Sequence, residues 1–300
     1  MKEKFLNHKT VIIILCIVMI LGISGGVFYA FNSGSDEDYT TSVKNGDKSE
    51  VYNSSIKITK NDIYKYYLKQ AGENEVLNLA MQEIADKEIT DKDAINKKVE
   101  ESKKTYATYA DDGKIETYAT SNGYSSLDSF VKEALEPDAK QQLLKAKYIN
   151  KNYKKLLSSL KVKYLKTIEC DTESAALNII KQATSSEKWD ELSTANSGSD
   201  LGMVTKSTST LDSKIVKKLS SFTKDGVYKK AIKTSEKKYA VVWVYNTDTS
   251  KVKSDIKEAL ASEDSVSTKY EAYYLKKYDF EVNEDKIKDS IKKSYPSYFE

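Results

Sequence analysis

The sequence has very little histidine, cysteine or proline. Its 300 residues include one histidine, His8, two cysteines and two prolines. A single histidine leaves no pair of imidazoles for proton transfer. Cys16 lies inside a long apolar run and leaves Cys170 without a partner, so we expect neither an intrachain disulfide nor a cysteine metal cluster. We therefore expect no metal and no cofactor, with Cys170 as a small apolar filler rather than a nucleophile.

An excess of charge of one sign is also missing. Lysine and arginine number 48 and the acidic residues 45, a net charge of +3, and the two signs are interspersed. Such a mixed surface gives no reason to expect a nucleic-acid partner. The chain also lacks a phosphate-cradling glycine loop, a His-Glu metal motif and a nucleophile elbow. Tyrosine, in contrast, is abundant, with 22 residues. Many tyrosines and few prolines are typical of long helices with aromatic faces.

Residues 10–31 carry no charge and are numerous enough to cross a hydrocarbon layer of about 30 Å as a helix. Three lysines precede this run, so residues 1–9 are expected in the cytoplasm and the bulk of the chain outside, behind a single-pass anchor in the cell membrane. A cleaved signal peptide is the alternative. The small residues that its cut site needs are poorly matched, so the uncleaved anchor is favoured. Cys16, inside the run, is not placed for lipidation.

After the anchor, residues 32–54 are polar and show no apolar period, which predicts a flexible spacer. Helical patterns follow over residues 55–160. Thr59 and Thr90 each precede an acidic residue by three positions, as helix caps do, and apolar residues at helical spacing come after each. Pro137 opens a further helix at its first turn, where a missing N–H costs nothing.

A smaller domain of mixed type is expected over residues 161–248. An extended apolar run at 162–170 precedes a helical pattern at 172–192, and an apolar strand follows at 239–244. Between them, residues 197–204 predict a glycine-bearing turn, because a positive φ is nearly free for glycine and costly for most other residues.

The tail, residues 249–300, repeats the helical theme, with one helix from Val252 to Leu275 and a short final one at 285–291. A segment so rich in tyrosine is expected to pack back on the N-terminal helices and to complete one helical domain from two separate segments. The predicted fold class is therefore α+β. It combines an N-terminal transmembrane helix, a helical domain made from N- and C-terminal segments, and a small central α/β domain.

Several short segments of the sequence match one known family. They are Ile-Thr-Lys-Asn-Asp-Ile-Tyr at 58–64, Ile-Thr-Asp-Lys-Asp at 89–93, Asn-Gly-Tyr at 122–124, Ser-Phe at 129–130, Gly-Ser-Asp-Leu-Gly at 198–202 and Tyr-Asp-Phe-Glu-Val-Asn-Glu-Asp-Lys at 278–286. In this order they resemble the extracytoplasmic foldases of the PrsA type, and more loosely the periplasmic chaperone SurA. The resemblance implies a SurA-like helical chaperone domain around a central domain of the parvulin (rotamase) type of peptidyl-prolyl isomerase. The family's Gly-Gly-Asp-Leu-Gly turn signature falls here on Gly198, Asp200, Leu201 and Gly202.

A prolyl isomerase acts on a barrier of about 18–20 kcal/mol by stripping water from the prolyl ring and favouring a twisted amide. Active members of the family use two histidines on adjacent strands, with a cysteine or acidic residue nearby. The resemblance places these positions on Lys166, Ala195 and Ala240, and none keeps the family residue. We therefore expect no catalytic residue and a domain that is silent or very weak, while the family itself is a peptidyl-prolyl cis-trans isomerase, so whether the chain is an enzyme stays open.

An apolar substrate groove would not need those polar groups. Leu211 and Ile215 fall near the family's Met and Phe positions, and Trp243 lies one strand away. Ordinary core packing is the alternative for all three. The direction in which the Lys166 side chain points stays open.

These features favour a membrane-anchored, extracytoplasmic chaperone or foldase that assists the folding of secreted proteins. Its partners would be unfolded or partly folded secreted chains, held weakly on a mixed-charge surface with exposed tyrosines. The candidate client contacts are Tyr64, Tyr67, Tyr106, Tyr109, Tyr270, Tyr273 and Tyr274, and helix packing is the alternative for each. The competing hypothesis is a cell-surface adhesion or scaffold protein that binds one specific folded partner. A homodimer through the helices stays open.

Overall fold

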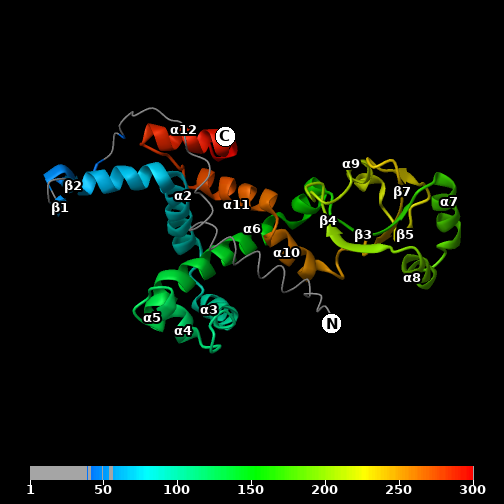
Figure 1. Cartoon of the computed structure of the whole chain (residues 1–300), viewed down its shortest axis with the longest axis horizontal. Helices are drawn as coiled ribbons and strands as arrows, with labels where there is room; N and C mark the ends of the chain where they lie inside the picture. Colours follow the sequence, from blue (N-terminus) through cyan, green and yellow to red (C-terminus); the bar gives the residue numbers. More distant parts are fainter. Residues whose placement is uncertain (1–38, 40–41, 49, 54–56, 300) are drawn as a thin grey trace. The chain divides into compact units, whose positions relative to one another are not determined.

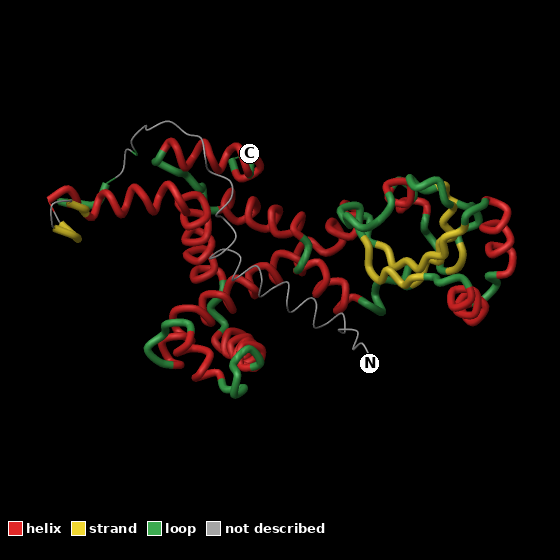
Figure 2. Tube along the Cα trace, in the orientation of Figure 1, coloured by secondary structure: helices red, strands yellow, loops and turns green. Residues whose placement is uncertain are grey.

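The computed structural model describes residues 39, 42–48, 50–53 and 57–299. Contacts divide the chain into two compact units, one made of the residues up to Tyr148 together with Ser267–Glu300 and the other of Ile149–Val266. The second unit therefore includes the end of one helix and a whole helix that the sequence assigned to the helical domain. Helices make up most of the described chain and strands form two small sheets, so the fold is of mixed α and β type (Figure 2).

In the first unit a 3-10 turn and a short hairpin lead directly into a long helix (Figure 1). The elements are a 3-10 turn (Gly46–Lys48), β1 (Glu50–Asn53), β2 (Lys57–Thr59) and α2 (Lys60–Glu88). Thr59 ends the hairpin and caps α2. Its hydroxyl accepts a hydrogen bond from the Asp62 amide at 3.2 Å, and the Asp62 carboxylate accepts one from the Thr59 amide at 2.7 Å. This reciprocal capping box confirms the helix start that the sequence predicts at Thr59.

Short helices then pack around an aromatic cluster. They are α3 (Lys92–Ala107), α4 (Ile115–Ser121), α5 (Leu127–Phe130) and a π-helical turn (Val131–Leu135). Asp91 caps α3, one residue after the predicted Thr90, because its carboxylate accepts from two backbone amides of the first turn. The rings at centroid distances of 4.8–5.7 Å from that of Phe130 are those of Tyr106, Tyr118 and Tyr124.

Helix α6 (Glu136–Leu160) follows, with Pro137 in its first turn as predicted. At the C-terminal end of the chain come α11 (Asp264–Lys277), α12 (Asp285–Ser294) and a 3-10 turn (Pro296–Tyr298). The predicted single helix from Val252 to Leu275 is in fact two, since α10 (Lys253–Ala261) ends before α11 begins. At the break, Ser262 and Glu263 turn the chain through hydrogen bonds to carbonyls three residues back.

Two contacts fix the C-terminal segment on α2. The Glu88 carboxylate accepts hydrogen bonds from Lys147, 2.8 Å away, and from Lys277 and Tyr278. Further along the segment, Ile287 of α12 packs against Gly72 of α2. A Cβ atom added to Gly72 would lie 3.0 Å from the Cδ1 atom of Ile287. Gly72 therefore lets α12 approach the backbone of α2 closely.

The second unit holds one antiparallel sheet. Its elements are β3 (Lys163–Cys170), α7 (Glu173–Gln182), α8 (Ser186–Ala195), β4 (Ser199–Val204), α9 (Ser213–Val216), a 3-10 turn (Leu219–Ser221), β5 (Gly226–Val227), β6 (Ile232–Lys233), β7 (Tyr239–Tyr245) and α10. The strand order is β4-β3-β7-β5, and β6 pairs with the other end of β7. The helical pattern predicted at 172–192 is two helices, because Ser185 caps the second one by accepting from the Lys188 amide.

The two faces of this sheet carry separate apolar cores. Leu165 and Val242 lie in one core together with residues of α9 and the loops that follow it. Ile168 and Val241 lie in the other, with residues of α7 and with Trp189 of α8, which is fully buried. We call these the α9 face and the α7–α8 face. Alternation along the strands decides which side chain reaches which face.

Candidate functional site

Lys166 and Ala240, which the sequence resemblance aligned with the family's two histidines, lie on opposite faces of the sheet. In the pairing of β3 with β7, Lys166 is opposite Trp243 and Glu169 is opposite Ala240. Directly opposed residues share a face, and successive residues of a strand alternate. Ala240 therefore lies on the α9 face, in the same core as Leu165, while Lys166 lies on the α7–α8 face. The structure does not bring the two positions together.

Lys166 is held by an ion pair and an aromatic ring. Its Nζ atom is 3.0 Å from Asp190 Oδ1 of α8 and 5.8 Å from the centre of the Tyr245 ring. The two charged side chains are 26% and 61% exposed, so this is a surface ion pair, worth about 0–1 kcal/mol. The Lys166 ammonium is therefore engaged at the surface of the α7–α8 face, by Asp190 and by the Tyr245 ring.

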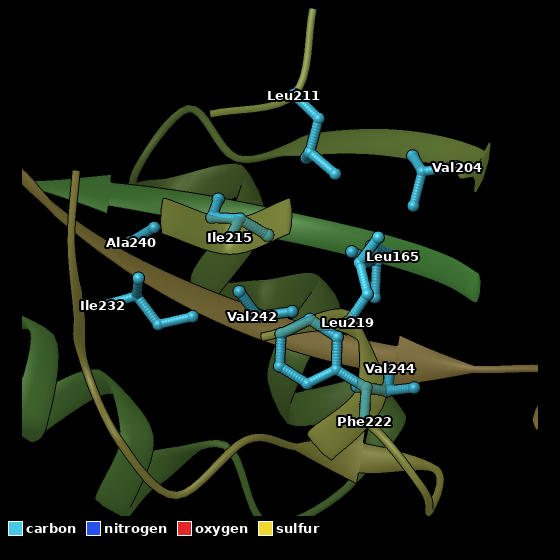
Figure 3. Close-up of a cluster of buried hydrophobic side chains, with 10 residues drawn as sticks. All are labelled: Leu165, Val204, Leu211, Ile215, Leu219, Phe222, Ile232, Ala240, Val242 and Val244. Atoms are coloured by element: carbon cyan, nitrogen blue, oxygen red, sulfur yellow. The ribbon is translucent and has the colours of Figure 1, made fainter. Parts of the chain in front are cut away.

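Ala240 lies in a closed apolar cluster on the α9 face. Figure 3 shows its ten buried side chains, which are those of Leu165, Val204, Leu211, Ile215, Leu219, Phe222, Ile232, Ala240, Val242 and Val244. Leu211 and Ile215, two of the predicted groove residues, are only 7% and 5% exposed and pack inside this cluster. None of the ten side chains can be ionised, so they supply no acid, base or nucleophile.

Trp243, the third predicted groove residue, lies on the other face. Its ring is 5.5 Å from that of Trp189, between centroids, on the α7–α8 face. Leu211 and Ile215 therefore do not line a common groove with it. Ala195, which the resemblance aligned with the family's cysteine or acidic position, is the last residue of α8 and is exposed.

The glycine segment forms strand β4, where the sequence predicted a turn. Positive φ values occur at Ser197 (51°), just before the strand, and at Gly202 (63°), within it. The pairing with β3 skips Leu201, which is the extra residue of a β-bulge. Gly202 thus uses its conformational freedom for a bulge rather than a turn, because the bulged strand needs one residue in the left-handed region.

Gly198 and Asp200 of this segment have structural contacts. A Cβ atom on Gly198 would lie 2.3 Å from the Ser193 hydroxyl oxygen and 3.0 Å from Ser193 Cα, so any larger residue would force Ser193 to shift. The Asp200 carboxylate accepts hydrogen bonds from the Gly202 amide at 2.9 Å and from the Tyr245 hydroxyl at 2.7 Å. Burial, followed by the bond to this carboxylate, raises the pKa of Tyr245. These contacts tie β4 to β7 across β3.

Three of the candidate client tyrosines are buried and cannot meet a client in this structure. Tyr106, Tyr270 and Tyr274 are 6%, 5% and 3% exposed, because their rings pack into the cores between helices. For these three the expectation of client contact is corrected in favour of helix packing. Tyr109 and Tyr67 are exposed, while Tyr64 and Tyr273 are half-buried. For these four, client contact stays a prediction.

The first unit has a cleft that the sequence analysis missed. It has a volume of about 500 Å³, and its lining residues are Asp86, Ile89, Thr90, Lys92, Ile95, Asn96, Glu136 and Lys140. The cleft is crossed by an ion pair in which Lys140 Nζ lies 2.5 Å from Asp86 Oδ1. The lining comes from the end of α2, the start of α3 and the start of α6. Charged residues at three helix ends were the one sequence signal, and nothing in their spacing indicates that they meet.

Neither a metal site nor a reactive thiol emerges from the described residues. No three His, Cys, Asp or Glu side chains among them are grouped so as to hold a metal ion. Cys170 is free and buried, and burial followed by the charge of Asp171 raises the pKa of its thiol, which disfavours the nucleophilic thiolate.

The anchor predicted over residues 10–31 lies outside the described residues. Within the described part, none of the helices combines the length and the apolar character that crossing a membrane requires.

No protein-family profile matches the sequence, and no curated protein does. Among solved structures, the chain is similar to PrsA from Bacillus subtilis, with 22% identity over 81% of this chain and 98% of that one, at a TM-score of 0.39. It is also similar to the peptidylprolyl isomerase PrsA from Bacillus cereus, with 15% identity over 83% and 99% of the two chains, at a TM-score of 0.45. Foldase protein PrsA from Streptococcus pneumoniae is 15% identical over 81% of this chain and 98% of that one, at a TM-score of 0.36. These are foldases of the type that the short sequence segments resemble. No TM-score among the three reaches 0.5, so the activity of this chain has to be inferred from its own residues.

Proposed function

We propose that this chain is a membrane-anchored, extracytoplasmic chaperone or foldase that holds unfolded or partly folded secreted proteins. The observation that carries the proposal is the cleft of the first unit. Its lining mixes isoleucine side chains with lysine and carboxylate groups, which offers both apolar and polar contacts to a chain segment. In this proposal residues 55–160 and 249–300 form the chaperone domain and residues 161–248 a parvulin-like domain.

The parvulin-like domain has little or no isomerase activity in this proposal. The Ala240 position lies in an apolar cluster without an ionisable side chain, and Lys166 points to the other face. Stabilising a twisted amide needs dipoles or charges aimed at one desolvated place. Neither face of the sheet offers such a combination at the two family positions. The domain then serves as a structural module or as an additional contact for clients.

Two assays on the full chain in lipid nanodiscs test the proposal together. The first follows light scattering while denatured citrate synthase is diluted into the sample, and the second measures the isomerisation of a proline tetrapeptide. We expect suppressed aggregation and an isomerisation rate close to the uncatalysed one. An isomerisation rate comparable with that of a histidine-bearing parvulin would contradict the silent domain.

A matched pair of variants tests whether the cleft is the binding surface. Asn96 lines the cleft and is exposed, and its neighbour Lys97 is exposed without lining it. Asn96→Trp partly fills the cleft and should weaken the suppression of aggregation several-fold, whereas Lys97→Trp should leave it unchanged. Equal effects of the two variants would remove the cleft from the proposal. Binding of one folded partner, with no effect on denatured proteins, would favour the scaffold hypothesis instead.

A further inference from the structure

The tip of the first unit exposes a group of large apolar side chains. The group, which we call the tip patch, consists of Val51, Ile58, Ile63, Tyr66 and Tyr67. Ile63 and Tyr66 are 48% and 65% exposed, although side chains of this size are usually buried. They lie where the hairpin β1–β2 meets the first turns of α2, at the end of that helix away from α3 (Figure 1). An exposed apolar group of this kind indicates a surface that binds something.

Three residues of the tip patch lie on one face of α2. Ile63 lies three and four positions before Tyr66 and Tyr67, so the three side chains share one face of α2. Asn61 is buried and ties the chain before the hairpin to the helix. Its side chain accepts from the Val43 amide at 2.8 Å and donates to the Asp47 carboxylate at 2.8 Å. The preceding turn, the hairpin and the helix start therefore present the patch together.

Lysines outnumber carboxylates around the tip patch, with Lys57 paired to Glu50 at 2.8 Å and the carboxylate of Glu75 beside Tyr67. Residues 43–70 contain six lysines and three carboxylates, a net charge of +3 in a chain whose total is also +3. Lys60 and Lys69 are exposed on α2 beside the patch. Tyrosine and isoleucine flanked by lysine are the side chains that suit the boundary between water and an anionic lipid surface.

The tip patch is also close along the chain to the predicted anchor. The uncharged run ends at Phe31, and only residues 32–42 separate it from Val43. A stretch of that length reaches at most about 40 Å, however it is arranged. The 3-10 turn, the hairpin and the start of α2 thus follow the predicted anchor closely along the chain, and with the anchor in place they cannot move far from the bilayer.

We propose that the tip patch lies on the anionic lipid surface of the membrane that holds the anchor, with Ile63, Tyr66 and Tyr67 in the headgroup region and the lysines on lipid phosphates. This inference rests on the proposed membrane anchoring. It assigns Tyr67 to lipid rather than to a client. It also gives the first unit a preferred side toward the membrane, because a second contact next to the anchor removes much of its rotational freedom.

The test uses the full chain with Cys16→Ser and Cys170→Ala, labelled with an environment-sensitive fluorophore at Gln70→Cys. Gln70 is exposed three residues after Tyr67, so all five patch residues stay in place. Lys97→Cys, exposed on α3, is the matched label site. The chain is placed in nanodiscs of phosphatidylcholine alone or mixed with phosphatidylglycerol, and some discs carry doxyl-labelled lipid as a quencher.

In the discs that contain phosphatidylglycerol, we expect the emission of the fluorophore at position 70 to be blue-shifted relative to position 97. Its quenching by the doxyl lipid should be at least about twofold stronger. High salt should reduce the difference, because lipid phosphates are screened. Ile63→Ser with Tyr66→Ser should abolish it, and so should Lys60→Glu with Lys69→Glu. Lys97→Glu with Lys132→Glu is the matched charge control and should leave the quenching at position 70 unchanged.

Other results would overturn the inference, each in a recognisable way. Equal quenching at both positions means that the tip patch does not touch lipid. A blue shift without quenching, which grows with the number of chains per disc, means a second copy covers the patch. A shift that appears only after denatured citrate synthase is added means a client does. Extraction of the chain from the discs by alkaline carbonate would instead show that the anchor itself fails.

Discussion

The Tyr245 hydroxyl donates a hydrogen bond to the Asp200 carboxylate at 2.7 Å and so joins β7 to β4, two strands that do not pair with each other. The same carboxylate oxygen accepts from the Gly202 amide at the bulge. One side chain thus holds both the bulge and the edge strand. The glycine segment is therefore important for stability, whether or not the domain has any activity.

Tyr245→Phe should destabilise the second unit by about 1–2 kcal/mol, because it removes a hydrogen bond to a charged group. Asp200→Ala should cost more, since it also frees the Gly202 amide. The double variant should be destabilised by less than the sum of the two single variants, because the two residues act through one hydrogen bond. Both tryptophans of the chain, Trp189 and Trp243, lie in this unit, so urea unfolding followed by tryptophan fluorescence measures it separately. Strictly additive costs would show that the bond contributes nothing.

Gly198→Ala should destabilise the same unit by about 1–3 kcal/mol through steric overlap, since the new Cβ atom would lie 2.3 Å from the Ser193 hydroxyl oxygen. Ser193→Ala removes that oxygen and should restore part of the loss. The recovery should stay incomplete, because Ser193 Cα would still be 3.0 Å away. The unfolding midpoint by tryptophan fluorescence measures both effects. A fully stable Gly198→Ala protein would contradict the close approach of the two segments.

Replacing Lys166 and Ala240 by histidine together should not create an isomerase, because the two imidazoles would lie on opposite faces of the sheet. Ala240 is 1% exposed, so the larger side chain should also cost about 1–3 kcal/mol by overpacking the apolar cluster. The tetrapeptide isomerisation rate of the double variant measures the outcome, with tryptophan fluorescence as the control for folding. A rate that rises to that of a histidine-bearing parvulin would mean that the two positions share a site.

Parts of the fold could be predicted from local sequence alone. Thr59 with Asp62 predicted a helix start because a capping box needs only residues within one turn. The runs that form β3 and β7 were recognisable from their continuous apolar character, which is typical of buried strands. Such features depend on neighbours in the chain, and the structure has them where the sequence placed them.

Features that depend on long-range pairing could not be predicted in this way. A turn and a β-bulge both use glycine at a positive φ, so the residues around Gly202 do not distinguish them. Whether Lys166 and Ala240 share a face depends on strand register, and a slip of one residue would reverse the answer. The cleft joins three helix ends that are distant in sequence, and no periodicity reports that they meet.

Glu88 gives the first unit a stability that depends on pH. Its side chain is 10% exposed and accepts from Lys147, 2.8 Å away, and from Lys277 and Tyr278. The hydrogen bond from Lys147, followed by that from Lys277, lowers the pKa of Glu88 from its usual 4.5 to about 2. A carboxyl group with a depressed folded-state pKa stabilises the protein fully above its unfolded pKa. That stability is lost as the pH falls from about 4.5 toward 2.

Glu88→Gln should therefore destabilise the first unit by about 1 kcal/mol at pH 7, a value kept small because the ion pairs are partly screened by solvent. The difference from the unchanged chain should shrink below pH 4.5 and disappear only below about pH 2, where Glu88 becomes protonated in the folded state as well. Far-ultraviolet circular dichroism during unfolding measures the loss of stability in the first unit. Tryptophan fluorescence, which reports the second unit, should not change. Glu83→Gln, at an exposed site on the same helix, is the matched control and should show no such dependence. A Glu88→Gln cost that stayed constant from pH 7 to pH 2 would show that the loss comes from packing and not from the charge.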